Sequence, residues 1–478
     1  MTIPSEFLRQ MDGVTGWQAE SFCRVQDSGE QVQSIRLNKA KIPGADLLDF
    51  PTASNVPWSE SGLYLSERPK YTLDPLLHAG GYYVQEASSM FLEQAIRQLN
   101  TKKEGCRVLD LCAAPGGKST HLLSLLPEHS VLVSNEVIKT RVTILEENLI
   151  KWGDPNRIIT NNDPRDFSAL GPSFDIILVD APCSGSGMFR RDPKAIEEWS
   201  PELVELCAQR QQRILADIWP CLREGGLLIY STCSYSVQED EDIVDWICEE
   251  FDAESLSVRL ESSWDIVETI SPRKQGWGYR FFPDRVKGEG LFLSAFRKTD
   301  VRNNEFNTVI NEKYSSGSGK KADRSGGKKG KIKLEKAGRQ QVQDLQDWIK
   351  PGLSDFYLLQ DTIIGMPGSV AELLHELGSL YIRSAGLALG KWAGKQLVPD
   401  HALAVSTMLA KENIAQTALD LDAAIAFLRK EEVPTEGSKP GWNLATYKNL
   451  GLGWLKVLPN RSNNYYPKEW RILMQNQR

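Results

Sequence analysis

Short apolar runs alternate with amphipathic stretches through the middle of the chain. The runs are rich in Val, Ile and Leu, which is typical of buried parallel strands, and they lie at residues 107–112, 131–135, 157–160, 174–179 and 226–231, with a late run at 290–296. Helical periodicity fits between them at 117–126, 139–152, 201–222 and 239–251. This alternation predicts an α/β fold, an open sheet wound on both faces by helices. Ligands of such sheets lie beyond the carboxyl ends of the strands.

The regions on either side of this pattern are less regular. A chain of 478 residues is too long for one hydrophobic core. We expect a helical cap and a small lobe over 1–100, the α/β domain over 101–300, a linker over 301–340 and a C-terminal α+β region over 341–478. The last region is rich in Trp, and we expect it to form one or two modules with their own cores and with helices near 370–380 and 414–429.

Charge is unevenly distributed along the chain. Residues 313–339 hold eight Lys, two Arg and two acidic residues, so they carry +8, and since the whole chain carries −7, the remainder carries −15. The segment is also rich in Gly and Ser, which indicates a solvated linker. It is either a spacer or an arm that contacts phosphates of a nucleic acid.

Several classes of protein are excluded by simple patterns. No run of 18 apolar residues occurs, so we expect no membrane span, and the first residues resemble neither a signal nor a transit peptide. The eight cysteines form no Cys-x-x-Cys pair and do not cluster with the five histidines. We therefore expect a cytoplasmic protein with reduced thiols and no metal site.

The first predicted strand leads into Asp110-Leu-Cys-Ala-Ala-Pro-Gly-Gly-Lys118-Ser-Thr. Two glycines at a helix start favour a negatively charged ligand group. A dinucleotide fingerprint would need Gly-x-Gly-x-x-Gly, and a phosphate-binding loop would need Gly where Cys112 stands. An S-adenosylmethionine loop needs only close backbone approach to a carboxylate. The loop by itself favours this last interpretation weakly.

Acidic residues follow the next two strands. Glu136 lies 20 residues beyond Gly116, a distance at which a carboxylate can accept both hydroxyls of a ribose. Asp163 follows the third strand, where it could accept the exocyclic amine of an adenine. Taken together in strand order, the two acids favour a cofactor that carries adenosine.

Cysteines follow the fourth and fifth strands. The segments are Asp180-Ala-Pro-Cys183-Ser-Gly and Ser231-Thr-Cys233-Ser, so both thiols can reach one pocket. A thiolate that adds to carbon 6 of cytosine makes carbon 5 nucleophilic enough to attack a sulfonium methyl, and Asp180 could contact the ring at N3. Two thiols beside an acid therefore indicate methylation of carbon 5. Either cysteine is a plausible nucleophile on this reasoning.

These segments resemble the RNA cytosine-5 methyltransferase family, the NOL1/NOP2/Sun group. The matching blocks span about residues 30–298 and also include Arg36-Leu-Asn38, Gln85-Glu-Ala-Ser-Ser89 and Gly288-Glu-Gly-Leu-Phe292. Two blocks in the tail, Gly386-Leu-Ala-Leu-Gly390 and Pro399-Asp-His-Ala-Leu403, are most like the branch of bacterial enzymes that act on 16S ribosomal RNA. In that branch a C-terminal PUA-like module helps to hold RNA.

The resemblance implies a class I, Rossmann-like, S-adenosylmethionine-dependent methyltransferase. It implies Cys233 as the nucleophile, Cys183 as the residue that assists product release and Asp180 as a cytosine contact. The implied cofactor-binding residues are Cys112, Ala113, Ala114, Pro115, Gly116, Gly117, Lys118, Glu136, Asp163 and Asp180. Asp284 is a departure, because many members have His there, and any role of that histidine is in doubt in this chain.

The resemblance also implies a substrate and partners. The substrate would be a cytosine in the decoding region of 16S ribosomal RNA, within the small ribosomal subunit, and we expect the enzyme to act as a monomer. Another ribosomal site or a tRNA is an alternative substrate. A non-catalytic RNA-binding assembly factor is an alternative from another class, and Gly-Gly-Lys-Ser leaves a P-loop ATPase as a third.

Overall fold

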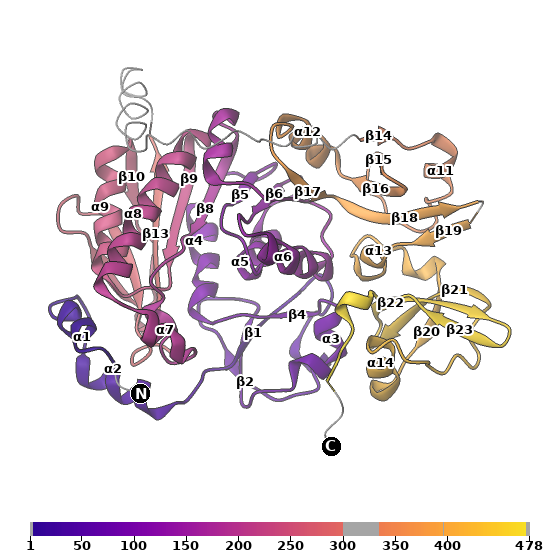
Figure 1. The fold of residues 1–478 in the computed structure, drawn as a ribbon, viewed down its shortest axis with the longest axis horizontal. Helices are drawn as coiled ribbons and strands as arrows, with labels where there is room; N and C mark the ends of the chain where they lie inside the picture. Colours follow the sequence, from indigo (N-terminus) through magenta and orange to yellow (C-terminus); the bar gives the residue numbers. More distant parts are fainter. Residues whose placement is uncertain (1–2, 300–333, 395, 475–478) are drawn as a thin grey trace, which may run out of the picture.

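The computed structural model describes residues 3–299, 334–394 and 396–474. Figure 1 shows a large central sheet with a small N-terminal lobe beside it and the C-terminal region packed against one side. Most of the predicted basic linker, including every lysine from Lys313 to Lys333, lies outside the described residues. Among the described helices, none is both long enough and apolar enough to cross a membrane.

Parallel strands form the centre of the large sheet, in the order β7-β6-β5-β8-β9. Their bounds are Arg107–Asp110 for β5, Val131–Asn135 for β6, Arg157–Thr160 for β7, Phe174–Asp180 for β8 and Leu222–Thr232 for β9. Each lies where the apolar runs predict a strand. The prediction of an α/β fold with a parallel sheet is therefore confirmed.

Helices cover both faces of this sheet. The first face packs on α4 (Leu92–Leu99), α5 (Gly117–Leu125) and α6 (Lys139–Trp152), and the second packs on α8 (Pro201–Ile218) and α9 (Glu241–Glu250). Successive strand residues belong to different cores: Leu132 lies in the first and Val133 in the second. Because neighbouring side chains on a strand point to opposite faces, a strand covered on both faces reads as a continuous apolar run.

Antiparallel strands extend the sheet at both edges. Beyond β9 lie β13 (Leu291–Lys298), β12 (Trp277–Phe281) and β11 (Val267–Ile270), and β10 (Ala253–Leu256) also pairs with β13. Only β13 is predicted by the sequence pattern. The other three are short, and β10 is only half-buried, so their apolar signal is weak.

The opposite edge is formed by a strand from the C-terminal region. Strand β17 (Ile382–Ala385) pairs antiparallel with β7, and α12 (Gly368–Glu376) contributes Val370, Leu373 and Leu374 to the second core. The C-terminal region therefore completes the catalytic sheet. The sequence pattern indicates no such pairing.

The N-terminal lobe begins with helices and continues as a small sheet. The helices are α1 (Ser5–Met11) and α2 (Ala19–Ser28), with the short α3 (Pro75–His78) later in the lobe. The sheet has the order β2-β3-β1-β4, with bounds Thr52–Asn55 for β2, Gly62–Leu65 for β3, Ser34–Leu37 for β1 and Tyr82–Val84 for β4.

The C-terminal region contains two further sheets. The first has the order β14-β15-β16-β18-β19, and its elements are β14 (Glu335–Lys336), α11 (Arg339–Gln343), β15 (Asp355–Leu359), β16 (Thr362–Met366), β18 (Leu387–Ala393), β19 (Gln396–Pro399) and α13 (His401–Val405). The second has the order β20-β21-β22-β23, and its elements are β20 (Ala415–Ala418), α14 (Leu421–Leu428), β21 (Gly441–Tyr447), β22 (Leu450–Leu458) and β23 (Arg461–Asn464).

Two predictions for the C-terminal region need correction. The predicted helix over 414–429 begins instead at Leu421, because Asp420 caps it by accepting from Ala423 N, and the residues before it form β20, which pairs with β21. The expected independent cores are also wrong in part. Leu452 and Phe427 share one core with Ile35 and Leu37 of the N-terminal lobe.

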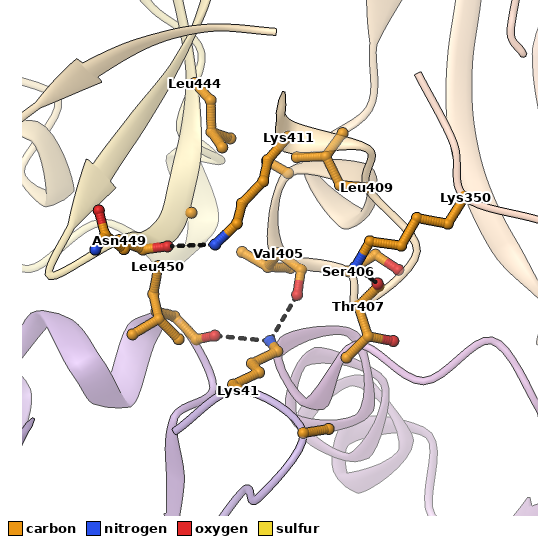
Figure 2. A pocket seen from close by; sticks show the side chains of 14 residues that line it. Lys41, Lys350, Val405, Ser406, Thr407, Leu409, Lys411, Leu444, Asn449 and Leu450 are labelled. Atoms are coloured by element: carbon orange, nitrogen blue, oxygen red, sulfur yellow. Dashed lines mark hydrogen bonds between the residues drawn. The ribbon is translucent and has the colours of Figure 1, made fainter. Parts of the chain in front are cut away.

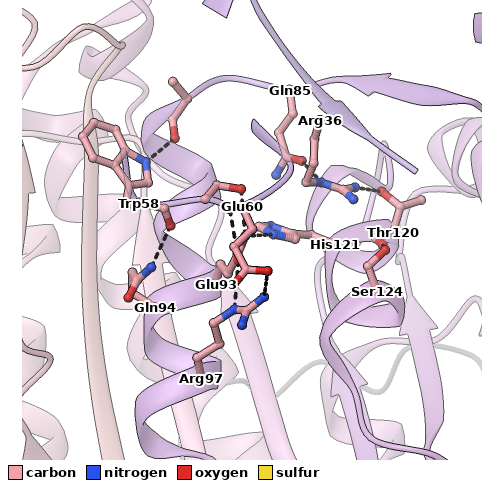
Figure 3. A network of polar contacts seen from close by, with 12 residues as sticks. Arg36, Trp58, Glu60, Gln85, Glu93, Gln94, Arg97, Thr120, His121 and Ser124 are labelled. Atoms are coloured by element: carbon pink, nitrogen blue, oxygen red, sulfur yellow. Dashed lines mark hydrogen bonds and ion pairs between the residues drawn. The ribbon is translucent and has the colours of Figure 1, made fainter. Parts of the chain in front are cut away.

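A buried arginine joins the N-terminal lobe to the catalytic domain (Figure 3). Arg36 is 0% exposed, and it donates from Nε to Gln85 Oε1 and from Nη2 to Thr120 Oγ1, each at 2.6 Å. Its guanidinium also lies 4.5 Å from the ring centroid of Trp152. Nη1 has no hydrogen-bond partner among the described residues, so these two bonds and the ring contact join β1 to α5 and α6 through Arg36.

A lysine joins three parts of the chain at the junction in Figure 2. Lys41 Nζ donates to the carbonyl oxygens of Ala79, Lys151 and Val405 at 2.7, 2.5 and 2.6 Å. These carbonyls end α3, α6 and α13, where helix dipoles are negative. Burial lowers the pKa of Lys41 to about 7, and in the protonated form its three donors match three helix ends from the lobe, the catalytic domain and the C-terminal region.

Replacing Lys41 should therefore destabilise the whole assembly. Lys41→Met would leave three carbonyl oxygens without this donor, so we expect the free energy of unfolding to fall by about 3 kcal/mol, measured by urea titration. Lys39→Met is the control, because Lys39 is exposed and donates to Pro43 O within its own turn. Equal stability of the two variants would contradict this role.

Candidate active site

The main chain of the loop after β5 is held in place by hydrogen bonds to neighbouring elements. Ala113 N donates to Asn135 O at 2.8 Å, Arg141 Nη2 donates to Ala114 O at 2.7 Å, and Asn148 Nδ2 donates to Pro115 O at 2.9 Å. Gly116 has a φ of 115° and would place a Cβ 3.3 Å from Leu145 Cδ1. The left-handed backbone and the close packing both favour glycine here, and α5 begins directly after it.

Glu136 lies at the end of β6, beside this loop. Its carboxylate is buried, accepts from Ile138 N at 2.9 Å and lies 3.5 Å from Arg141 Nη1. Since Arg141 also donates to Ala114 O, it links Glu136 to the loop. The structure therefore brings these two predicted parts of the site together.

Asp163 follows β7 on the same edge of the sheet. Its side chain is partly exposed and accepts from Arg165 N at 3.2 Å, and Arg213 Nη1 of α8 lies 3.9 Å away. These contacts cap the short turn that follows and involve none of the other predicted site residues. Asp163 thus stands at the expected strand end, apart from the Glu136 network.

Asp180 ends β8 and pairs with the lysine of the first loop. Its Oδ1 lies 2.8 Å from Lys118 Nζ and accepts from Ser231 Oγ at 2.8 Å. Burial lowers the pKa of Lys118, but the pair with Asp180 outweighs this and leaves the pKa raised. Lys118 is therefore a cation at physiological pH, directed at Asp180.

The two cysteines that follow β8 and β9 lie against each other. Cys183 Sγ and Cys233 Sγ are 3.1 Å apart, and neither cysteine is oxidised to a disulfide. The hydrogen bond between the sulfurs and burial raise the pKa of Cys183 well above its usual value. Cys183 therefore keeps its proton at neutral pH.

A glycine permits the close approach of the cysteine-bearing loops. Gly187 N donates to Cys233 O at 2.8 Å, and a Cβ on Gly187 would lie 2.7 Å from that oxygen. No larger residue fits without moving the backbone, which explains the glycine at position 187 in the Gly185-Ser-Gly187 turn after Cys183.

The remaining cysteines have other surroundings. Cys106, Cys207 and Cys221 are buried in the interior, as expected for thiols that only pack. In residues 3–299, 334–394 and 396–474, no group of three or more His, Cys, Asp or Glu side chains could hold a metal ion.

Sequence reasoning missed several buried charges around the cysteines. Glu239 accepts hydrogen bonds from Ser184 and Ser234, which adjoin the two cysteines. Arg280 pairs with Asp240 and Glu241. The four consecutive acids at 239–242 stand at a predicted helix start, and their number was the available signal.

Asp284, the position noted above as a departure from the family pattern, has a structural contact. It accepts a hydrogen bond from Ser21 Oγ of α2. This contact holds the N-terminal helices against the catalytic domain, and it leaves Asp284 outside the cluster of cysteines and Asp180.

The loop and its surroundings fit S-adenosylmethionine. Asp110 is 0% exposed; its Oδ2 accepts from Ser119 Oγ at 2.6 Å, while Oδ1 has no hydrogen-bond partner among the described residues. Burial raises the pKa of Asp110 to about 7. An unpartnered buried oxygen suits a donor such as an ammonium group, the start of α5 suits a carboxylate, and Glu136 suits ribose hydroxyls.

Comparison with known proteins agrees with this geometry. Residues 97–297 match the family model "16S rRNA methyltransferase RsmB/F", residues 415–472 match "Methyltransferase RsmF PUA domain", and residues 3–87 match "N-terminal domain of 16S rRNA methyltransferase RsmF". These matches exclude the P-loop ATPase alternative, because they assign the Gly-Gly-Lys-Ser loop to a methyltransferase domain.

Similar proteins span nearly the whole chain. Ribosomal RNA small subunit methyltransferase F of Enterobacter sp. (strain 638) is 30% identical over 91% of this chain and 89% of its own length. The protein of the same name from Vibrio vulnificus (strain YJ016) is 29% identical over 91% and 90%.

Solved structures share the fold. A methyltransferase homologue from Pyrococcus horikoshii has a TM-score of 0.51 and 27% identity over 62% of this chain and all of its own. NSun6 from the same organism has a TM-score of 0.52 and 21% identity over 62% and 99%. The class I, Rossmann-like methyltransferase fold and the C-terminal PUA domain are thus confirmed, as is S-adenosylmethionine as methyl donor, and the chain belongs to the ribosomal RNA small subunit methyltransferase F family.

Proposed function

We propose that this enzyme transfers the methyl group of S-adenosylmethionine to carbon 5 of a cytosine in 16S ribosomal RNA. The proposal depends on one observation above all, the contact of 3.1 Å between the sulfurs of Cys183 and Cys233 at the ends of adjacent parallel strands. Methylation of an oxygen or of an exocyclic nitrogen needs no covalent step and would not use two thiols. The family resemblance supports a cytosine in the decoding region as the target.

Cys233 is the nucleophile in this proposal. Its thiolate forms a bond from sulfur to carbon 6 of the cytosine, and the electron pair of the 5,6 double bond becomes available at carbon 5. S-adenosylmethionine supplies an electrophilic methyl group to that carbon. A water molecule then accepts the carbon 5 proton, the electron pair of that C–H bond restores the 5,6 double bond, and the bond from carbon 6 to sulfur breaks, so that Cys233 leaves as a thiolate.

Cys183 assists this last stage. It keeps its proton and its sulfur contacts Cys233 Sγ, so it is placed to return a proton to the departing thiolate. Asp180 pairs with Lys118 and accepts from Ser231, two residues before Cys233, and we assign Asp180 to the N3 edge of the cytosine.

Cofactor binding is assigned to the loop and the strand-end acids. Main-chain groups of residues 112–118 would hold the methionine portion at the start of α5, Glu136 would accept the ribose hydroxyls, and Asp163 would accept the adenine amine. Asp180 borders both the cofactor and the cytosine. The target base must be unstacked or flipped, since carbon 6 and the methyl donor approach its ring face.

Replacing the two cysteines should separate their roles. Cys233→Ala should abolish methyl transfer and covalent adduct formation, because no sulfur remains to attack carbon 6. Cys183→Ala should instead accumulate enzyme bound covalently to RNA, because release is slowed. Denaturing gel electrophoresis of enzyme mixed with labelled ribosomal RNA measures both.

Cys207→Ala is the matched control for these variants, since Cys207 is buried in α8. It should retain activity and show no trapped adduct. Adduct accumulation by Cys233→Ala rather than Cys183→Ala would reverse the role assignment.

Glu136 should determine much of the cofactor affinity. Glu136→Gln replaces a charged acceptor of two hydroxyls, so we expect the Kd for S-adenosylmethionine to rise about 10-fold, measured by isothermal titration calorimetry. Glu147→Gln on α6 is the control, because that carboxylate pairs with Lys151. Equal Kd values for the two variants would refute the ribose assignment.

The target itself can be mapped directly. Bisulfite sequencing of ribosomal RNA from cells with and without the gene should show one cytosine of 16S RNA that loses protection. Loss of protection in tRNA or at another ribosomal site would assign a different substrate. The same protection with and without the gene would favour a non-catalytic assembly factor. Tritiated methyl transfer to naked RNA and to assembled subunits would then identify the form of the substrate.

A further inference from the structure

One buried carboxylate is connected to both cysteine-bearing loops. Glu239 is 0% exposed. Its Oε1 accepts from Ser184 N at 2.8 Å and from Gln211 Nε2 at 3.0 Å, and its Oε2 accepts from Ser234 Oγ at 2.6 Å and from Ser184 Oγ. Ser184 directly follows Cys183, and Ser234 directly follows Cys233. The carboxylate thus connects chain segments that are 50 residues apart.

The next acidic residue holds the other side of the same loop. Asp240 Oδ1 accepts from Thr232 Oγ1 at 2.7 Å, and Thr232 directly precedes Cys233. Cys233 is therefore held on one side through Asp240 and on the other through Glu239. Arg280 lies 3.2 Å from Asp240 and also pairs with Glu241, so it supplies the positive charge beside these two buried acids.

The surroundings of Glu239 are rigid on the side away from the cysteines. Tyr230 OH donates to Glu239 O at 2.7 Å and also lies 3.0 Å from Gln211 Oε1, to which it can donate. Gln211 in α8 in turn donates to the carboxylate. A strand, a helix and the turn before α9 therefore fix the carboxylate, and the carboxylate fixes the two loops.

We propose that Glu239 is a positioning residue that sets the distance between the Cys183 and Cys233 sulfurs by binding both of their loops. It does not touch the reacting atoms in this structure; it acts through Ser184 and Ser234. A buried carboxylate that accepts four hydrogen bonds resists displacement, because each lost bond leaves a buried polar group unpaired. The use of this distance in catalysis rests on the proposed function.

The distance between the sulfurs can be measured without any methyl transfer. Phenylarsine oxide condenses with two adjacent thiols, forming two arsenic–sulfur bonds and releasing one water. The wild-type enzyme should bind one arsenical that is lost in both Cys183→Ser and Cys233→Ser. The affinity of the enzyme for phenylarsine oxide depends on how well the two sulfurs are held at a bridging distance before it binds.

Variants of Glu239 should then separate geometry from charge. Glu239→Ala removes all four hydrogen bonds, so arsenical affinity should fall about 10-fold and kcat about 100-fold, with KM for RNA within about 3-fold of wild type. Glu239→Gln should keep the arsenical affinity within about 3-fold, because its amide can donate to the two serine hydroxyls while its oxygen still accepts.

Asp245→Asn is the matched control on the following helix. Asp245 is also 0% exposed and accepts from Arg273 N and Lys274 N at 3.0 and 2.7 Å, contacts that hold a different loop. It should leave arsenical affinity and kcat close to wild type. If Glu239→Ala behaves like Asp245→Asn in both measurements, the positioning role is wrong.

A milder variant covers the case in which Glu239→Ala does not fold. Ser234→Ala removes only the link to the Cys233 loop, and arsenical affinity should fall by about 3-fold; an unchanged affinity in a folded Ser234→Ala would overturn the proposal. A lowered arsenical affinity in Glu239→Ala, with no RNA adduct in any variant including Cys183→Ala, would uphold the positioning role and refute the covalent mechanism instead.

Discussion

Parallel pairing of β5, β6, β7, β8 and β9 is the constraint on which the site depends. Because helices cover both faces of the sheet, reactive polar side chains that must reach a ligand lie at the strand ends. Parallel direction brings those ends to one edge, where Asp180 ends β8 and where Glu136, Asp163, Cys183 and Cys233 follow strands. The parallel direction of the strands by itself therefore gathers the reactive side chains at one edge of the sheet.

Two basic side chains, Arg36 buried and Lys41 partly buried, hold the parts of the chain in register together with the apolar contacts. Arg36 joins the N-terminal lobe to α5, and Lys41 joins three helix ends from three parts of the chain. A buried charge without partners is costly, so each of these residues permits few arrangements of the parts around it. β17 adds backbone hydrogen bonds between the C-terminal region and the catalytic domain by extending the sheet beyond β7.

Much of the catalytic domain was predictable, and the reason is local. A strand buried on both faces reads as an apolar run, and the residue after it is found by counting, so the parallel strands and the acids and thiols at their ends were identified. The strands β10, β11 and β12 were missed because short or half-exposed strands have little pattern. The residues 415–418 were assigned to a helix because their pairing with β21 depends on a strand more than twenty residues further along the chain.

The sequence by itself determined the fold class, the family and the set of chemical groups at the sheet edge, since periodicity, motif spacing and residue type are local properties. Tertiary structure alone decided that the C-terminal region shares its core with the N-terminal lobe, that β17 completes the catalytic sheet, and that Glu239 joins the loops of Cys183 and Cys233. The physical reason is that these are contacts between distant segments. A hydrogen bond to a buried carboxylate depends on where two segments lie in space. A local pattern of apolar and polar residues does not predict which distant segments come into contact.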